Sequence, residues 1–168
     1  MRESERAAYV QYVSDRQTAL RRTAYLLTGD RHRADDLVQD TITKVYVQWR
    51  RVSAADNVDA YVHTILVRTY ADDRRSRLWA MELFGDPPDG TAEAPDPGTR
   101  LALADALRRL APKQRATLVL RFYCDFSVEQ TARTLGCSTG TVKSQTSNAL
   151  DALRRLIPTS LTWKANDD

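Results

Sequence analysis

Short polar side chains gather on one face of the helix that the sequence predicts after Gly136. At helical spacing this face carries hydroxyl groups, one ammonium group and a glycine: Thr139, Gly140, Lys143, Ser144 and Ser147. Hydroxyl groups can hydrogen-bond to base edges, and an ammonium group can bind a phosphate. These residue types therefore predict a surface that reads duplex DNA through its major groove.

The residues around this face predict a helix-turn-helix motif. Ser127 and Gln130 have the spacing of a capping box, which would start a short first helix. Gly136 suits the turn, and Ser138 can cap the second helix. A small residue and an aliphatic residue stand at the expected packing positions, Ala132 and Val142. The alternative is an ordinary helical hairpin with a polar outer face.

The rest of the chain also has helical periodicity, and no alternating run of residues predicts a strand. Apolar residues recur mostly three or four apart in several segments: Leu20, Ala24 and Leu27; Val38, Ile42, Val45 and Trp49; Val58, Tyr61, Val62, Ile65 and Leu66; Leu103, Leu107 and Leu110; Ala116, Val119 and Leu120. Gly29 is expected to end one helix, and Asp56 or Asn57 to start another. The predicted fold class is all-α.

A stretch without this periodicity divides the chain. Residues 80–99 hold four of the six prolines, five acidic residues and no Lys or Arg. Proline and glycine disfavour both helix and central strand, so this stretch is predicted to be an acidic linker. The predicted organisation is two small helical domains, residues 1–79 and 100–158, joined by the linker and followed by a short tail, residues 159–168.

Composition excludes several classes of protein. The chain has 168 residues, 42% of them apolar and 28% charged, which is ordinary for a globular protein. No apolar run is long enough to cross a bilayer, so no membrane insertion is expected. Two cysteines and two histidines offer no disulfide framework or metal site. Cys124 and Cys137 are interpreted as small buried or half-buried residues. No cofactor and no catalytic residues are predicted.

Two stretches of sequence, taken together, are similar to a known family. Residues 127–156, with Gly140-Thr141-Val142-Lys143-Ser144, resemble the last domain of bacterial extracytoplasmic-function sigma factors. Asp35-Asp36-Leu37-Val38-Gln39-Asp40-Thr41, followed by Lys44-Val45-Tyr46, resembles the helix of that family that binds core RNA polymerase. The resemblance covers about residues 9–157 and is strongest to the actinobacterial sigma-E-like branch. It implies an alternative sigma factor that binds core polymerase and promoter DNA.

The resemblance assigns polymerase docking to Asp36, Gln39 and Asp40. Asp36 and Asp40 are four residues apart, so they share one helix face and repel each other slightly. A basic partner surface would relieve that repulsion. Without the resemblance, the simpler interpretation is that these acids solvate the helix and complement its dipole.

The resemblance also assigns the promoter contacts. The loop Arg50–Val58 and the helix Asp59–Arg77 would read and open the −10 element, with contacts from Arg68, Tyr70, Arg74, Arg75 and Arg77. In this assignment the arginines meet phosphates and the tyrosine stacks on an unpaired base. The last helix would read the −35 element, with contacts from Thr139, Thr141, Lys143, Ser144, Ser147 and Arg154.

A conventional helix-turn-helix regulator, with a sensing domain in residues 1–79, is the main alternative function. An enzyme is a third class, but the sequence has no nucleophile elbow, phosphate loop or cluster of metal ligands. Relatives of this kind are often held inactive by an anti-sigma protein, and nothing in the sequence identifies one. The expected location is the cytoplasm.

Overall fold

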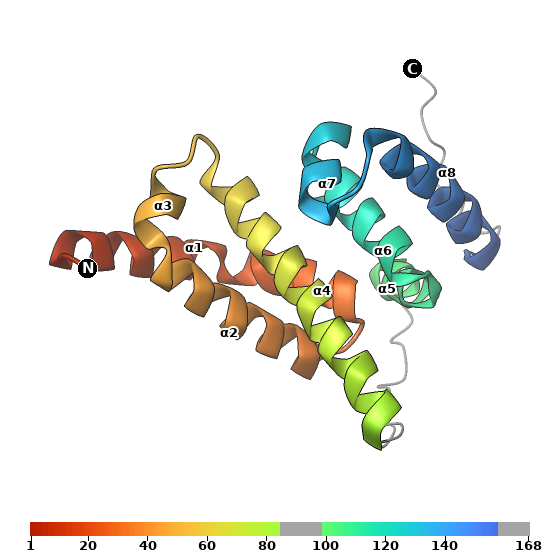
Figure 1. The fold of residues 1–168 in the computed structure, drawn as a ribbon, viewed down its shortest axis with the longest axis horizontal. Coiled ribbons are helices and arrows are strands. Elements are labelled where there is room, and N and C mark those ends of the chain that lie inside the picture. The colour runs from red at the N-terminus through yellow and green to blue at the C-terminus, as the bar shows by residue number, and fades with distance from the viewer. Residues whose placement is uncertain (85–98, 158–168) are drawn as a thin grey trace.

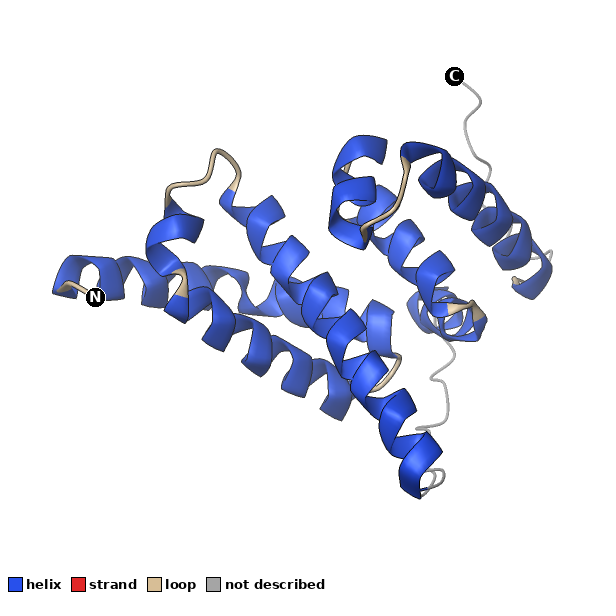
Figure 2. Cartoon of the chain, viewed as in Figure 1, coloured by secondary structure: helices blue, strands red, loops and turns tan. Residues whose placement is uncertain are grey.

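The computed structural model describes residues 1–84 and 99–157, and these residues form helices and connecting loops (Figures 1 and 2). The elements are α1 (Glu3–Thr28), α2 (Arg31–Val47), α3 (Trp49–Ser53), α4 (Val58–Phe84), α5 (Thr99–Arg109), α6 (Pro112–Leu118), the π-helical turn η1 (Val119–Tyr123), α7 (Val128–Leu135) and α8 (Thr139–Leu156). No strand occurs within the two described ranges. The prediction of an all-α fold is confirmed.

Local sequence explains where the first helices begin and end. Gly29, with φ 68°, ends α1 in the left-handed conformation, and its N–H donates to the Tyr25 carbonyl. The Asp30 side chain then accepts a hydrogen bond from the Arg33 N–H and caps α2. The Asn57 side chain accepts from the Ala60 N–H at 2.9 Å at the start of α4. These caps satisfy backbone groups that helix ends leave unpaired.

Helices α1–α4 form the first unit, in which α1 and α2 run antiparallel and α4 crosses them (Figure 1). Their apolar stripes meet in a buried core that includes Leu20, Leu27, Val38, Val45 and Leu66. Aromatic rings close the end of this core near the N-terminus, where the Tyr9 and Trp49 ring centroids are 5.5 Å apart. This packing fixes which faces of α2 and α4 remain outside.

Helices α5–α8 form the second unit, with a smaller core of Leu107, Leu110, Leu118 and Ala149. The two units are in contact. Ala116, Val119, Leu120 and Phe126 of the second unit belong to the same buried cluster as residues of α1 and α4. In this structure the two predicted domains therefore share one apolar interface.

The predicted linker boundaries need correction. Helix α4 continues through residues 80–84 and ends at Phe84, and Thr99 already belongs to α5. The two units are thus closer in sequence than the linker 80–99 implies. The remaining linker residues, 85–98, and the predicted tail, 159–168, lie outside the described residues.

Candidate nucleic-acid interface

The helix-turn-helix is present as the sequence predicted. The Ser127 side chain accepts from the Gln130 N–H at 3.0 Å, and the Gln130 side chain accepts from the Ser127 N–H at 2.9 Å. Gly136 adopts φ 66° and ends α7, a conformation that strains most other residues. Ser138 then accepts from the Thr141 N–H at 3.1 Å and starts α8. The capping box, turn and second cap are confirmed.

Helix α8 presents the predicted polar residues outward. Val142 and Ala149 are fully buried on its inner face. The six residues predicted to contact the −35 element are exposed: Thr139, Thr141, Lys143, Ser144, Ser147 and Arg154. Hydrogen bonds within the chain already engage some of them, since the Ser144 hydroxyl donates to the Thr141 carbonyl and Arg154 pairs with Asp151 at 3.4 Å. In the described part of the chain, Lys143 forms no ion pair.

Helix α2 brings together the predicted docking residues. Asp36, Gln39 and Asp40 are all exposed, while Leu37 and Val38 are buried on the opposite side. Within the described residues, neither aspartate forms an ion pair, so their charge faces solvent. The same strip continues along the helix to Val47, whose side chain is 78% exposed. Val47 was not predicted from the sequence as part of this strip. The signal that could have found it is an apolar residue on the polar face of an amphipathic helix.

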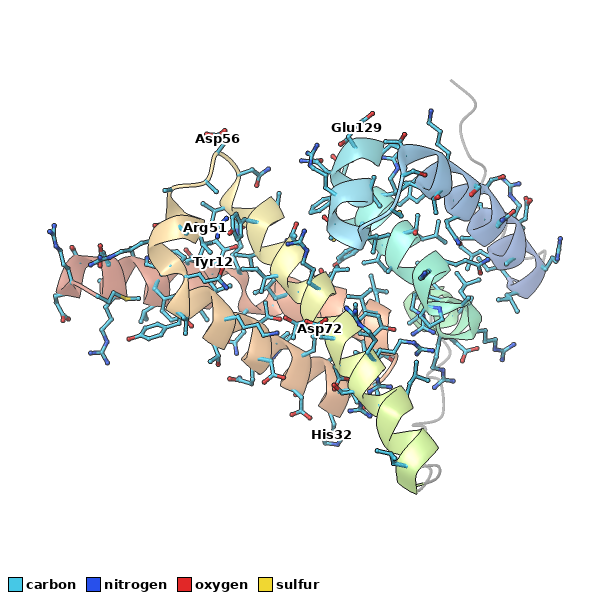
Figure 3. All side chains as sticks on the ribbon, viewed as in Figure 1. Tyr12, His32, Arg51, Asp56, Asp72 and Glu129 are labelled. Atoms are coloured by element: carbon cyan, nitrogen blue, oxygen red, sulfur yellow. The ribbon has the colours of Figure 1, made fainter. Side chains whose placement is uncertain are left out.

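The arginines of α4 do not form one cluster. Arg75 and Arg77 pair with acids on their own helix, Asp72 at 2.8 Å and Asp73 at 2.9 Å. Arg68 is exposed and lies toward the second unit, where it donates to the Arg133 carbonyl at 3.3 Å. Arg74 is half-buried. The predicted loop Arg50–Val58 includes most of α3, and Asp56 lies at the tip of the shorter loop that follows (Figure 3).

Tyr70 does not fit its predicted role, because its side chain is only 4% exposed. It belongs to the buried cluster shared by the two units, and its hydroxyl accepts a hydrogen bond from Arg115 at 3.4 Å. A ring enclosed in this way cannot stack on an unpaired base. In this arrangement of the units, Tyr70 is therefore not accessible for the predicted −10 contact.

Arg115 is an unexpected feature of the interface between the units. Its side chain is 7% exposed and donates to three carbonyl oxygens of its own unit, those of Leu107, Arg108 and Leu110. It also donates to the Leu27 carbonyl of the first unit at 2.6 Å. Burial lowers the pKa of the guanidinium group, yet arginine stays charged at neutral pH. In the sequence, Arg115 could be recognised only as a basic residue next to the apolar residues of α6.

The described residues contain no other recognised chemical site. No group of three His, Cys, Asp or Glu side chains among them could hold a metal ion. None of their helices combines the length and apolar character that a membrane span needs. Cys124 and Cys137 are free cysteines, and both are half-buried.

Comparisons with known proteins agree with this geometry. Residues 12–80 match the family model Sigma-70 region 2, and residues 100–153 match Sigma-70, region 4. The RNA polymerase sigma-E factor of Streptomyces coelicolor is 38% identical over 87% of this chain and 84% of its own length. The ECF RNA polymerase sigma factor SigL of Mycobacterium tuberculosis is 33% identical over 88% of each chain.

Among solved structures, the chain is similar to the sigma factor RpoE of Bartonella quintana, solved in complex with the anti-sigma factor NepR. The TM-score is 0.76 at 29% identity, covering 89% of this chain and 96% of that one. The regulator alternative is not favoured, because residues 12–80 match a sigma region. The chain belongs to the extracytoplasmic-function sigma factors, within the actinobacterial sigma-E branch, and is an alternative sigma factor that directs transcription initiation.

Proposed function

We propose that the two units divide the work of this sigma factor, the first docking on core polymerase and reading the −10 element, and the second reading the −35 element. The observation that carries this proposal is the order of the two matched regions on two separate helical units. Each unit leaves a polar helix face exposed, on α2 and on α8. The chain would act without catalytic chemistry of its own, in the cytoplasm, where polymerase and promoter meet.

The polymerase contact is proposed for Asp36, Gln39 and Asp40. Two aspartates without ion pairs among the described residues favour a basic partner surface, because association would bring opposite charges together. Replacing Asp36 or Asp40 with lysine should weaken co-purification with core polymerase while circular dichroism stays unchanged. Asp15→Lys, on the exposed side of α1, is the matched control and should bind normally. Undiminished binding by the two α2 variants would remove this assignment.

The promoter contacts are proposed for two sets of exposed or half-exposed residues. On the first unit they are Arg68, Arg74, Arg75 and Arg77; on the second they are Thr139, Thr141, Lys143, Ser144, Ser147 and Arg154. The cations would hold phosphates, and the hydroxyls of α8 would face base edges. Transcription in vitro tests the proposal: discrete start sites should appear only when the protein is added to core polymerase. Absence of such starts on every genomic template would contradict it.

The promoter requires a different arrangement of the two units. The −10 and −35 elements are about 25 base pairs apart, which is about 85 Å along the duplex. A compact chain of this length has a radius of gyration of only about 15 Å. In this structure α4 and α7 touch, with the Thr64 and Thr134 hydroxyl oxygens 3.3 Å apart. The structure thus corresponds to a closed state, and the units must separate to reach both elements.

A protein partner that favours one of these states would control the sigma factor. The solved relative described above is in complex with an anti-sigma factor. By analogy we propose an anti-sigma partner for this chain as well. Co-purification of the tagged chain from its own cells, with identification of bound proteins, would test this proposal.

A further inference from the structure

A cavity of about 750 Å³ lies where the two units meet. Its walls come from α2, α3 and α4 of the first unit and from α7 of the second. Arg51 points from α3 toward α4 on this side of the molecule (Figure 3). The residues that matter for its chemistry are Lys44, Gln48, Arg51, Tyr61, Arg68 and Arg133. The volume is in the range of small-molecule sites, about 300–1,000 Å³.

The charge of this cavity is uncompensated. Four of the lining residues are Lys or Arg, and none is Asp or Glu. Lys44 and Arg68 donate to neutral acceptors, the Thr69 hydroxyl and the Arg133 carbonyl. Within the described residues, the guanidinium groups of Arg51 and Arg133 form no ion pair. Because four cations line one cavity whose walls hold no Asp or Glu, a bound anion would be attracted to it.

Other groups in the walls suit a base. Tyr61 is half-buried, with its ring against the core, and can offer a stacking surface. The exposed Gln48 amide can both donate and accept hydrogen bonds. The aromatic ring and the amide suit a base and the cations suit phosphates, so the lining matches the two ends of a nucleotide. We propose that this cavity binds a nucleoside polyphosphate, with its phosphates on the cations and its base beside Tyr61.

The site is complete only when the units are closed. Lys44, Arg51 and Arg68 belong to the first unit, whereas Arg133 belongs to α7 of the second. A ligand that contacts all four binds the closed state more tightly than the open state, so it shifts the equilibrium toward closure. Since Arg68 is also a proposed −10 contact, bound nucleotide would oppose promoter binding. This regulatory consequence rests on the proposed function, whereas nucleotide binding does not.

Calorimetry on the full chain without polymerase tests the binding directly, with ATP, GTP and inorganic triphosphate as probes. At least one nucleotide should bind, and more tightly than triphosphate. Arg133→Ala should weaken its binding by at least about tenfold, the effect of one charge-assisted contact. Arg155→Ala removes an exposed arginine of the same unit far along α8 and should leave binding unchanged. No binding at millimolar concentration, or equal loss in both variants, would overturn the proposal.

Two further measurements separate this site from a simple DNA-binding surface. Bound nucleotide should slow alkylation of Cys124, which packs against the shared cluster between the units. A single-stranded −10 oligonucleotide should bind Arg133→Ala as well as the parent, because the first unit alone would hold it. If Arg133→Ala instead weakens binding of the oligonucleotide, and no nucleotide binds the parent chain, the cavity is part of the DNA site and the proposal is wrong. Equal binding of ATP and triphosphate would overturn the role of Tyr61.

Discussion

Replacing Arg115 with methionine tests how the two units are held together. The side chain keeps a similar length but loses every hydrogen-bond donor. In the parent, the buried guanidinium group donates to five acceptors: the carbonyl oxygens of Leu27, Leu107, Arg108 and Leu110, and the Tyr70 hydroxyl. The carbonyls of Leu107 and Arg108 lie in the last turn of α5 and that of Leu110 directly follows it, where helix carbonyls lack intrahelical partners. Of these, the Leu107 carbonyl also accepts a hydrogen bond from the Leu110 N–H. The substitution therefore leaves several buried oxygens unpaired.

The size of the effect follows from those acceptors. Leaving a buried polar group without a partner costs about 1–3 kcal/mol, and removing one partner of a buried charged network costs about 3–5 kcal/mol. We expect Arg115→Met to lower the free energy of unfolding by about 3–5 kcal/mol. Two of the five bonds, to Leu27 and Tyr70, reach the first unit. Their loss should shift the closed–open equilibrium toward the open state by about tenfold to a hundredfold.

Two assays separate these effects. Urea denaturation followed by circular dichroism gives the free energy of unfolding. The alkylation rate of Cys124 under native conditions reports opening, because this thiol is half-buried at the interface. Arg109→Met is the matched control: Arg109 is exposed and pairs with Asp105 on its own helix, so its loss should cost less than about 1 kcal/mol. If Arg115→Met unfolds like this control and Cys124 reacts at the parental rate, Arg115 does not hold the units together.

Three other outcomes are expected. Lys143→Ala should weaken transcription from all promoters and lower the salt dependence of DNA binding by about one unit, whereas Ser144→Ala should change promoter preference; parental transcription by both variants would mean that α8 is not the reading helix. Burial raises the pKa of the Cys124 thiol from 9.0 to about 11, so between these pH values the unfolded state loses the proton while the folded state keeps it. The free energy of unfolding should therefore fall between about pH 9 and pH 11. A Cys124→Ala variant with the same pH dependence in urea titrations would contradict this cause. Gly29→Ala should lower the free energy of unfolding by about 1–2 kcal/mol, and with it the melting temperature, because φ is 68° and the added Cβ would lie 2.7 Å from Arg108 Cδ. An unchanged melting temperature would contradict this strain.

The sequence predicted well those features that depend on neighbouring residues. The ends of α1, α7 and α8 follow from Gly29, Gly136 and two serine caps, all of which act over four residues or fewer. The polar face of α8 also follows from periodicity, because helix geometry alone decides which residues share a side. The docking residues of α2 are exposed for the same reason. Such features need no knowledge of the rest of the fold.

The features that the sequence did not predict depend mostly on contacts between distant segments. Tyr70 lies four residues after the buried Leu66, so it continues the inner stripe of α4, yet its enclosure depends on Arg115 from the second unit. Arg115 itself appears in sequence as an ordinary surface cation. The π-helical turn at Val119–Tyr123 adds a residue to its helix and shifts the side chains that follow, which simple periodicity does not foresee. The docking of the two units explains the enclosure of Tyr70 and the burial of Arg115.

The accessible surfaces of the closed state indicate an order of events during initiation. The α2 face with Asp36 and Asp40, proposed above as the docking face, is exposed, so on that proposal core polymerase could dock before the units separate. The α4 face is different, because Thr64 and Arg68 contact α7 residues of the second unit. On the proposed assignments, reading of the −10 element would therefore require opening, whereas docking would not. Because a partner can shift this equilibrium only by binding the two states unequally, polymerase must contact the open state more tightly to drive the separation.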